Sequence, residues 1–520
     1  MSLNMGKRAI LKKTAQAGSA TFISRILGII REFLFVRFLG VSAISDAFLV
    51  AFKIPAFLRK IFAEGALSAA AVPMFVKKIK EGKFEEANSL MTTSFLFFEG
   101  LVFLLCLYVF FFTQSVIKIV APGFSVEQVN YAIPFLRILF PLIFFISSSA
   151  LLAAALQAVN HFFVPAFAPA LLNISIVSTL LFCLKFNLDP YWLCFGVLFG
   201  GLLIFLSHII VYFIYNFKFG SISVEAYQDF KFIFKKFVFC LVGIGIVEIN
   251  LFIDTIIGSY LPKGSVTLLH YGGRFMSIPL GIFAVSFSNV LLSHFSRISL
   301  YAPSRLKFYL LEVTKFTTFI IIPATLFLFF TSEKIFSMIM FGKNIGPEKV
   351  FIAKWILIIY CIGLVFFALN KILLNVFYSL KDTFTPTIAL GISTIVNFVG
   401  NVIGMYFWGI YGLPGSTVLS GVVLTFLNFY LLKRKYNITF YSVNFFNFLG
   451  RFLIQVLLVC CFAFISYFSF LNMFEGTGWY LFFTAKWGYW LLVFSITVLS
   501  YLFIIISRKI FGLKLYFLSK

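Results

Sequence analysis

Charged residues lie inside stretches that are otherwise apolar enough to cross a membrane. In GIIREFLFVRFLG (residues 28–40), Arg31, Glu32 and Arg37 interrupt an apolar run, and Arg25 lies just upstream. A charged side chain at bilayer depth costs free energy, so such residues line cavities or pair with one another. Arg37, near the helix end, can extend its charge to the interface. Arg25 and Arg31 are therefore the stronger candidates for function.

The next stretch, SDAFLVAFKIPAFLRKIFAEGALSAAAVPMF (45–75), carries a polar stripe. At about 100° per residue, its polar members fall within roughly 40° of one another around the helix; they are Asp46, Lys53, Lys60 and Glu64. The stripe must face protein or water rather than lipid. Lys60 and Glu64 are four residues apart and are spaced to pair, whereas Arg59 points elsewhere.

Basic residues outnumber acidic ones in these stretches and in HYGGRFMSIPLG, which adds Arg274. The basic members are Arg25, Arg31, Arg37, Lys53, Arg59, Lys60 and Arg274, and the acidic members are Glu32, Asp46 and Glu64. A cavity with surplus positive charge suits an anion, and the guanidinium fork matches phosphate or diphosphate. Structural ion pairs of the three acidic residues are the alternative, and the sequence leaves both open.

Composition gives the class of protein that must position these charges. The 520 residues are 61% hydrophobic, 20% aromatic and 12% charged, and the mean hydropathy is +1.04. Such values are typical of polytopic membrane proteins. Apolar runs of roughly 20 residues, without the alternation of barrel strands, favour helices. We expect an all-α polytopic membrane protein.

About fourteen transmembrane helices are predicted from apolar runs and their Pro, Gly and charge breaks. They fall near 14–40, 44–76, 88–114, 130–157, 161–185, 190–217, 232–260, 266–297, 311–331, 350–379, 384–407, 411–432, 446–470 and 480–507. The two termini and every second connection together carry twenty-three basic residues, and the connections on the opposite side carry eight. The positive-inside rule therefore predicts cytoplasmic N- and C-termini. The net charge of +24 then faces anionic lipid, and no nucleic-acid partner is expected.

Two sequence echoes indicate an internal duplication. Phe-x-Pro precedes a helix at both Pro165 and Pro386, 221 residues apart, and Pro55 and Pro279 lie in similar segments 224 residues apart. Six helices per repeat give both halves the same direction in the membrane, as in parallel-repeat transporters. We predict an N-terminal lobe at 1–217, a C-terminal lobe at 218–435, and two additional helices at 436–520.

These residues resemble a known family. The segments SRILGIIRE (24–32), 45–75 and YGGRFMSIPLGIFAVSFSNVLL (271–292) are similar to the bacterial MurJ/MviN proteins, lipid II flippases of the multidrug/oligosaccharidyl-lipid/polysaccharide exporter superfamily. The resemblance implies fourteen helices in two lobes around a cationic central cavity. It implies transport of undecaprenyl-diphosphate-linked disaccharide-pentapeptide from the inner to the outer leaflet of the bacterial cytoplasmic membrane, for peptidoglycan synthesis.

The resemblance also implies roles for single residues. By motif position the family's important arginines fall on Arg25, Arg31, Arg59 and Arg274, and its acidic positions fall on Asp46 and Glu64. The polar stripe adds Lys53 to the expected substrate-binding residues. Glu32 stands where an Asp is usual, and Gly273 stands where an acidic residue commonly precedes the arginine. Some relatives bind sodium, for which Asp254 and Asn370 are weak candidates here.

Rival functions remain to be weighed. A multidrug cation antiporter of the same superfamily would need an acidic cavity, which the charge balance disfavours. A flippase for another polyprenyl-diphosphate-linked glycan fits the charges nearly as well, and only the motifs favour lipid II. A membrane enzyme would need clustered carboxylates or a His/Asp pair, and His161 and His208 have no such partners in sequence. We expect a transporter without a cofactor, with Na⁺ or the membrane potential as alternative driving forces. Its expected partners are membrane lipids and the cell-wall synthesis machinery.

Overall fold

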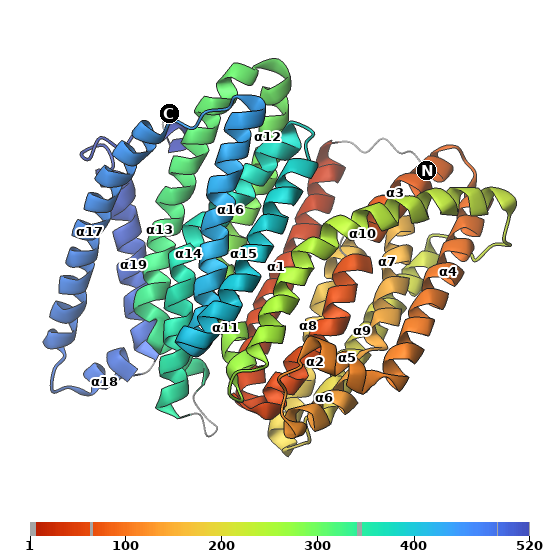
Figure 1. The fold of residues 1–520 in the computed structure, drawn as a ribbon, viewed down its shortest axis with the longest axis horizontal. Coiled ribbons are helices and arrows are strands. Elements are labelled where there is room, and N and C mark those ends of the chain that lie inside the picture. The colour runs from red at the N-terminus through yellow and green to blue at the C-terminus, as the bar shows by residue number, and fades with distance from the viewer. Residues whose placement is uncertain (1–6, 63–65, 341–345, 486, 519–520) are drawn as a thin grey trace. The chain divides into compact units, whose positions relative to one another are not determined.

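The computed structural model describes residues 7–62, 66–340, 346–485 and 487–518, and in these ranges it consists of helices and the turns between them (Figure 1). The predicted all-α fold is confirmed. The earlier helices are α1 (Lys7–Leu39), α2 (Ala43–Phe62), α3 (Ala66–Lys80), α4 (Phe84–Phe111), α5 (Thr113–Val120), α6 (Val126–Leu139), α7 (Leu142–Ala158), α8 (Phe163–Phe186), α9 (Tyr191–Ile214) and α10 (Val224–Gly258). The later ones are α11 (Ser265–Pro279), the π-helix η1 (Leu280–Val285), α12 (Ser286–Tyr301), η2 (Pro303–Arg305), α13 (Leu306–Ile339), α14 (Pro347–Ser379), α15 (Phe384–Trp408), η3 (Gly409–Tyr411), α16 (Gly412–Tyr436), α17 (Ser442–Met473), α18 (Gly478–Ala485), α19 (Trp487–Ser507) and η4 (Tyr516–Leu518).

Each of the fourteen expected spans falls on one to three of these helices. Within the described ranges, nine helical segments are long and apolar enough to cross a membrane. Four of the expected spans, 14–40, 44–76, 232–260 and 266–297, are not among the nine, although their described residues are mainly helical. The first two and the last of these contain the intramembrane charges described above. The protein is therefore a multi-pass membrane protein, and the count of fourteen stays a prediction.

The first of two compact units comprises residues 1–270, 335–353 and 401–413. In it α1 packs along α8, α2 packs on α6, and α7 packs between α3, α4 and α9. The α7 sequence LIFFISSSALLAAALQA is rich in small residues and almost all of it is buried, which allows close helix approach. The helix α10 packs on α3 and α4 in this unit, although the repeat places it in the second predicted lobe. That lobe boundary, at 217/218, stays a prediction.

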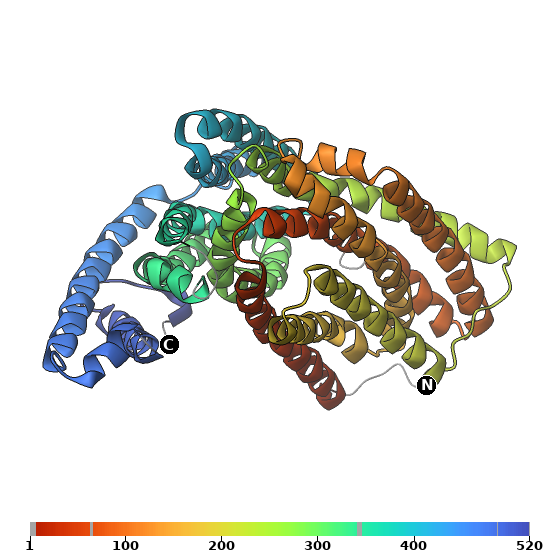
Figure 2. The ribbon, with the colours of Figure 1, turned by 90° about the horizontal axis from the view of Figure 1, so that it is seen from below.

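The second unit comprises residues 271–334, 354–400 and 414–520. One apolar cluster joins α12, α13, α14 and α16 through buried side chains such as Phe295, Leu310 and Phe377. Another joins α13 to α17 and α19 through Phe319 and Phe452. Figure 2 shows α17 and α19 in blue with α18 between them in the chain, and the three helices contact one another.

Several helix ends follow local sequence rules. Ser125 caps α6 in a capping box with Gln128, a pattern that satisfies free backbone N–H groups at a helix start. Asn187 ends α8 in the left-handed conformation at φ 51°, which Asn tolerates better than most residues.

The turn between α14 and α15 contains a buried carboxylate. Burial alone would raise the pKa of Asp382, but hydrogen bonds from Lys435, Thr385 and Tyr436 outweigh it and hold that pKa well below its usual range. The carboxylate therefore stays charged and ties the turn to the end of α16.

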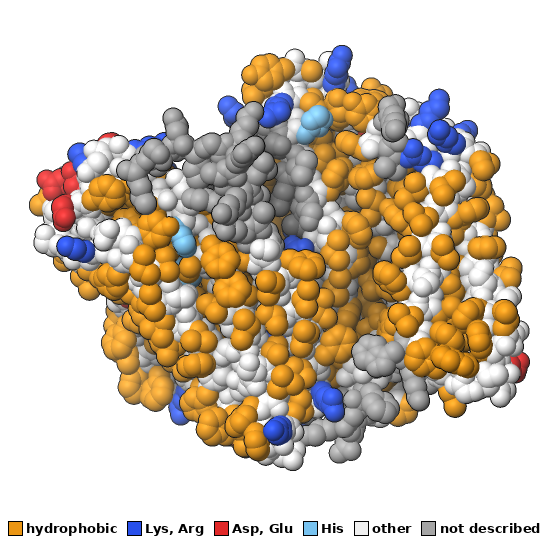
Figure 3. All heavy atoms as spheres, turned by 180° about the vertical axis from the view of Figure 1, so that it is seen from behind, with side chains coloured by type: hydrophobic (Ala, Val, Ile, Leu, Met, Phe, Trp, Pro, Cys, Tyr) orange, Lys and Arg blue, Asp and Glu red, His pale blue; other side chains and the backbone are white. Residues whose placement is uncertain are grey.

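The molecular surface has the character expected for a membrane protein. Figure 3 shows hydrophobic side chains over most of the helix flanks, with Lys and Arg side chains gathered toward the helix ends. Large exposed apolar side chains include Phe103, Phe111 and Phe407. Exposed apolar surface of this extent would be unfavourable in water and suits contact with lipid.

Candidate functional site

Arg31 is held in place by residues from two helices of the first unit. Its Nη1 donates to Asn173 Oδ1 of α8 at 3.0 Å, and its Nη2 pairs with Glu32 Oε1 at 2.6 Å. The other oxygen of Glu32, Oε2, lies 3.7 Å from His270 Nε2. The side chains of Arg31 and Glu32 are 18% and 17% exposed, so they form a half-buried pair inside an apolar helix. Two bonds fix the plane of the guanidinium.

Asn173 also ties this pair to the start of the candidate motif. Its Nδ2 donates to the backbone O of Ser24 at 3.0 Å and to Ser24 Oγ at 3.3 Å. The amide therefore bonds α1 at two points, Ser24 and Arg31, which are seven residues apart on one face of the helix. The α1–α8 contact orients the motif SRILGIIRE.

Asp46 acts as a distant cap for α11. Its Oδ2 accepts from Gly264 N at 2.6 Å, and its Oδ1 accepts from Thr267 N at 2.8 Å and Thr267 Oγ1 at 2.6 Å. Gln128 Nε2 of α6 donates to Oδ2 at 3.1 Å. The first N–H groups of a helix lack partners within the helix and carry partial positive charge, so a carboxylate stabilises them. The side chain is 1% exposed and has four donors.

Gly264 is required where α11 begins. Its φ is +93°, and a Cβ there would lie 2.7 Å from Val41 Cγ1. An L side chain would therefore meet both an unfavourable backbone conformation and a clash. The glycine brings its N–H within reach of Asp46.

Lys53 contacts α10 one turn before that helix ends. Its Nζ donates to Thr255 Oγ1 and lies 5.9 Å from the ring centroid of Phe252. Asp254, which precedes Thr255 in the chain, accepts a hydrogen bond from Asn401 Nδ2 at 2.6 Å and is attracted electrostatically by Lys53. Asp46 and Lys53 both bond to residues between 255 and 267, so these two members of the predicted stripe face protein rather than lipid.

The remaining predicted site residues have diverse environments. Arg25 and Arg37 are exposed on α1, Arg59 and Lys60 are half-buried on α2, and Glu64 lies outside the described residues. Arg274, in the second unit, is exposed on α11. The roles assigned to these residues stay predictions.

The sodium-binding role of Asp254 and Asn370 stays a prediction. Asn370, in the second unit, donates through Nδ2 to the backbone O of Gly421 at 2.9 Å. Asp254 has the amine of Lys53 in its surroundings, and a cation there competes with a metal ion. Within the described ranges, no group of three or more His, Cys, Asp or Glu side chains is placed to hold a metal.

Three polar residues that matter here were not predicted from the sequence. Asn173 and His270 lie far along the chain from the Arg31–Glu32 pair that they contact, and no local pattern connects them. Glu99 is different, because it interrupts the apolar run FLFFEGLVFLL and the rule applied to α1 would have found it. Its carboxyl is 4% exposed, and Ser147 Oγ of α7 donates to its Oε1 at 2.7 Å.

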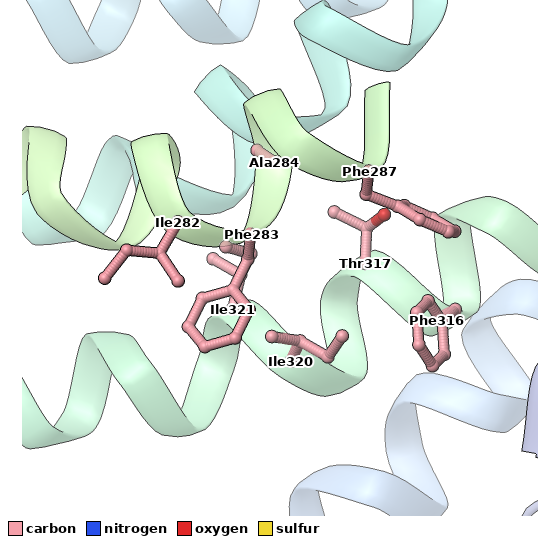
Figure 4. Close-up of a pocket in the computed structure, with 8 residues that line it drawn as sticks. All are labelled: Ile282, Phe283, Ala284, Phe287, Phe316, Thr317, Ile320 and Ile321. Carbon is pink, nitrogen blue, oxygen red and sulfur yellow. The ribbon is translucent and has the colours of Figure 1, made fainter. Parts of the chain in front are cut away.

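An apolar cavity of about 260 Å³ lies in the second unit between η1, α12 and α13. Figure 4 shows Phe283 of η1 close to Ile320 and Ile321 of α13, with Phe287 and Phe316 at the other end. Ile320 also packs against the cluster that joins α13 to α17 and α19. The lining suits hydrocarbon rather than a polar ligand.

The chain is similar to a known protein family over most of its length. The family model described as "Lipid II flippase MurJ" matches residues 35–507. The probable lipid II flippase MurJ of Buchnera aphidicola subsp. Schizaphis graminum is 32% identical over 471 residues, 88% of this chain and 90% of the relative. The lipid II flippase MurJ of Thermosipho africanus is 30% identical over 406 residues, 78% of this chain and 82% of the relative.

Solved structures give a consistent result. A structure described as lipid II flippase MurJ in an inward closed conformation superposes with a TM-score of 0.75 at 28% identity, covering 95% of this chain and 99% of that one. An inward-facing multidrug resistance MATE family transporter of the MOP superfamily gives a TM-score of 0.68 at 13% identity, covering 78% of this chain and 92% of that one. The second likeness is one of fold alone.

Proposed function

Because the chain belongs to the lipid II flippase MurJ family, we propose that it moves lipid II from the inner to the outer leaflet of the bacterial cytoplasmic membrane. The family match over residues 35–507 is the observation that carries this proposal. The surplus of basic residues in α1 and α2 supports it, because the diphosphate of lipid II is an anion that arginine binds well. In this proposal the chain is a transporter and not an enzyme.

Arg25, Arg31 and Arg59 bind the diphosphate, and the sequence-based hypothesis adds Arg274 and Lys53 to this set. Arg31 is the best-oriented member, because Asn173 and Glu32 each accept from one of its terminal nitrogens and a guanidinium has five N–H donors in all. In an inward-open state the diphosphate binds these cations while the sugar-peptide head fills the cavity. The bound anion offsets repulsion among the arginines, which permits closure.

The two predicted lobes, 1–217 and 218–435, rock to open the cavity outward, and Asp46, Glu64 and Glu32 take part in gating. The prenyl tail stays in lipid beside the C-terminal helices, 436–520. The apolar cavity along α13 supports this placement of the tail, because its lining adjoins the packing of α13 against α17 and α19. Both termini lie in the cytoplasm, as the positive-inside rule predicts.

The driving force is either Na⁺ or the membrane potential, which is worth roughly 2.3 kcal/mol per charge per 100 mV. Membrane lipids surround the protein, and the enzymes of cell-wall synthesis are its expected partners in the cell.

The test uses bacteria whose own lipid II flippase can be depleted. Such cells produce this chain or its variants Arg31→Ala, Arg274→Ala and Arg37→Ala, and the fraction of lipid II exposed on the outer leaflet is measured. We expect the unaltered chain and Arg37→Ala to restore exposure. Arg31→Ala and Arg274→Ala should lower it at least tenfold at equal abundance, because each removes a charged contact worth at least about 1.5 kcal/mol. Full exposure with both variants would refute the arginine clamp.

A second candidate is a flippase for another polyprenyl-diphosphate-linked glycan, which the same surplus of basic residues would suit. Failure of the unaltered chain to expose lipid II while inserting normally would favour it. The fold likeness to a multidrug transporter brings in a third candidate, but that class would need an acidic cavity for cationic drugs.

A further inference from the structure

Glu99 lies near the middle of α4, with its carboxyl on the side of the helix that faces α7. It is 4% exposed, and neighbouring residues of α4 such as Phe103 and Leu104 are more than half exposed toward the lipid side. Its Oε1 accepts from Ser147 Oγ at 2.7 Å. Its Oε2 is buried without a hydrogen-bond partner. An ionised carboxylate in such a place is costly unless a cation balances it.

The helices packed against α4 offer no such balance. They are α3, α5, α7 and α10, and α7 has no titratable residue at all. The charged residues of the other three are Lys77, Lys78 and Lys80 of α3, Lys118 of α5, and Glu225, Asp229, Lys231, Lys235, Lys236, Glu248 and Asp254 of α10. Among the side chains that the structure describes, none of these acts on Glu99, whose polar neighbours are Ser147 and Ser148.

The buried lysine of α3, Lys78, is engaged elsewhere. Lys78 pairs with Glu86 and Asp229, each at 2.6 Å. Glu86 is thirteen residues before Glu99 on α4, about 20 Å at 1.5 Å per residue. Cys106, two turns after Glu99, is within electrostatic range of it but supplies no positive charge. Among the described side chains, none therefore supplies a positive charge to Glu99.

We propose that Glu99, with Ser147 and Ser148, is a proton-binding site. The proton is carried on Oε2, and the new O–H donates to Ser148 Oγ, whose hydroxyl is fully buried and without another partner. Ser147 donates to Oε1 as observed. On release of the proton, the Ser148 hydroxyl rotates and donates to the carboxylate, because a serine hydroxyl can act as donor or acceptor. Both states are thus accommodated without moving the helices.

The first half of α4 provides a polar route toward this site. Buried polar side chains occur at Asn88, Ser89, Thr93 and Ser94, between the Lys78–Glu86 pair and Glu99. The hydroxyl of Ser94 is buried without a hydrogen-bond partner. We place proton entry at this end of α4, where the segment begins with the exposed Glu85.

Infrared spectroscopy of the purified full-length protein tests the proposal directly. Spectra at pH 7 are recorded for the unaltered chain, Glu99→Gln and the matched control Glu85→Gln, an exposed acid on the same helix. We expect one carboxylic-acid C=O band in the unaltered chain and in Glu85→Gln that Glu99→Gln lacks. Equal bands in all three proteins would overturn the proposal.

A second measurement separates a proton from a sodium ion. Thermal unfolding is followed from pH 5 to pH 9 in sodium-containing and sodium-free buffers of equal ionic strength. A proton held by the folded state alone lowers the folding equilibrium constant by up to tenfold per pH unit as pH rises, and Glu99→Gln should lose this dependence. If sodium stabilises the unaltered chain but not Glu99→Gln, the bound cation is Na⁺ and not a proton. That result would overturn the proposal. Coupling of the site to transport rests on the proposed function, but neither measurement depends on transport.

Discussion

Two carboxyl groups of the first unit, Asp46 and Glu99, are almost equally buried but have opposite surroundings. Asp46 accepts four hydrogen bonds, two of them from backbone N–H groups at the start of α11. Glu99 accepts one, and its second oxygen has no partner. A carboxylate with its full set of donors stabilises a fold, whereas one without them costs free energy and needs another reason to be present. The difference indicates that Asp46 stabilises the start of α11, and it supports the proposal that Glu99 binds a cation.

The largest loss of stability is expected for a substitution of Asp46. Asp46→Ala leaves the N–H groups of Gly264 and Thr267 buried without their acceptor, together with the amide of Gln128. We expect a loss of about 4 kcal/mol in the free energy of unfolding, because buried donors of a charged acceptor are left unpaired. Thermal unfolding of detergent-purified protein measures it, with Glu85→Ala as an exposed acidic control. A loss no larger than that of the control would contradict the architectural role.

A smaller loss of stability is expected for a substitution of Gly264, whose backbone N–H donates to Asp46. Gly264→Ala places a Cβ at φ +93° and 2.7 Å from Val41 Cγ1, so the start of α11 must shift away from Asp46. We expect destabilisation by about 2 kcal/mol, the usual range for a strained left-handed residue. The control is Gly415→Ala, since nothing lies within 4 Å of a Cβ there and it is helical. Equal melting temperatures for the two variants would show that α11 does not depend on this approach.

The sequence predicted the helices better than the contacts that position the charges. Apolar runs place most of the helices, because each span must satisfy its backbone internally. The bond from Arg31 to Asn173 joins residues 142 apart and that from Lys53 to Thr255 joins residues 202 apart, and no local pattern specifies such partners. Asp46 sits in the first turn of its own helix α2, so its role as the cap of α11 was not predictable. Glu99 was predictable as a candidate, but its unpaired oxygen was not.

The smallest change in stability is expected for a substitution of Glu99. This measurement would separate the roles of Glu99 and Asp46 most clearly. Glu99→Leu replaces a partly satisfied carboxyl by an apolar side chain of similar size, and Ser147 Oγ keeps the backbone O of Phe144 at 3.2 Å as an acceptor. Replacing a buried polar group in this way is often neutral or stabilising. We therefore expect the free energy of unfolding to change by less than about 1 kcal/mol, measured by thermal unfolding beside Asp46→Leu. A loss at Glu99 as large as that at Asp46 would show that the carboxyl is a structural partner of α7. A neutral result, together with loss of the infrared band in Glu99→Gln, leaves cation binding as the reason for an acid at this depth.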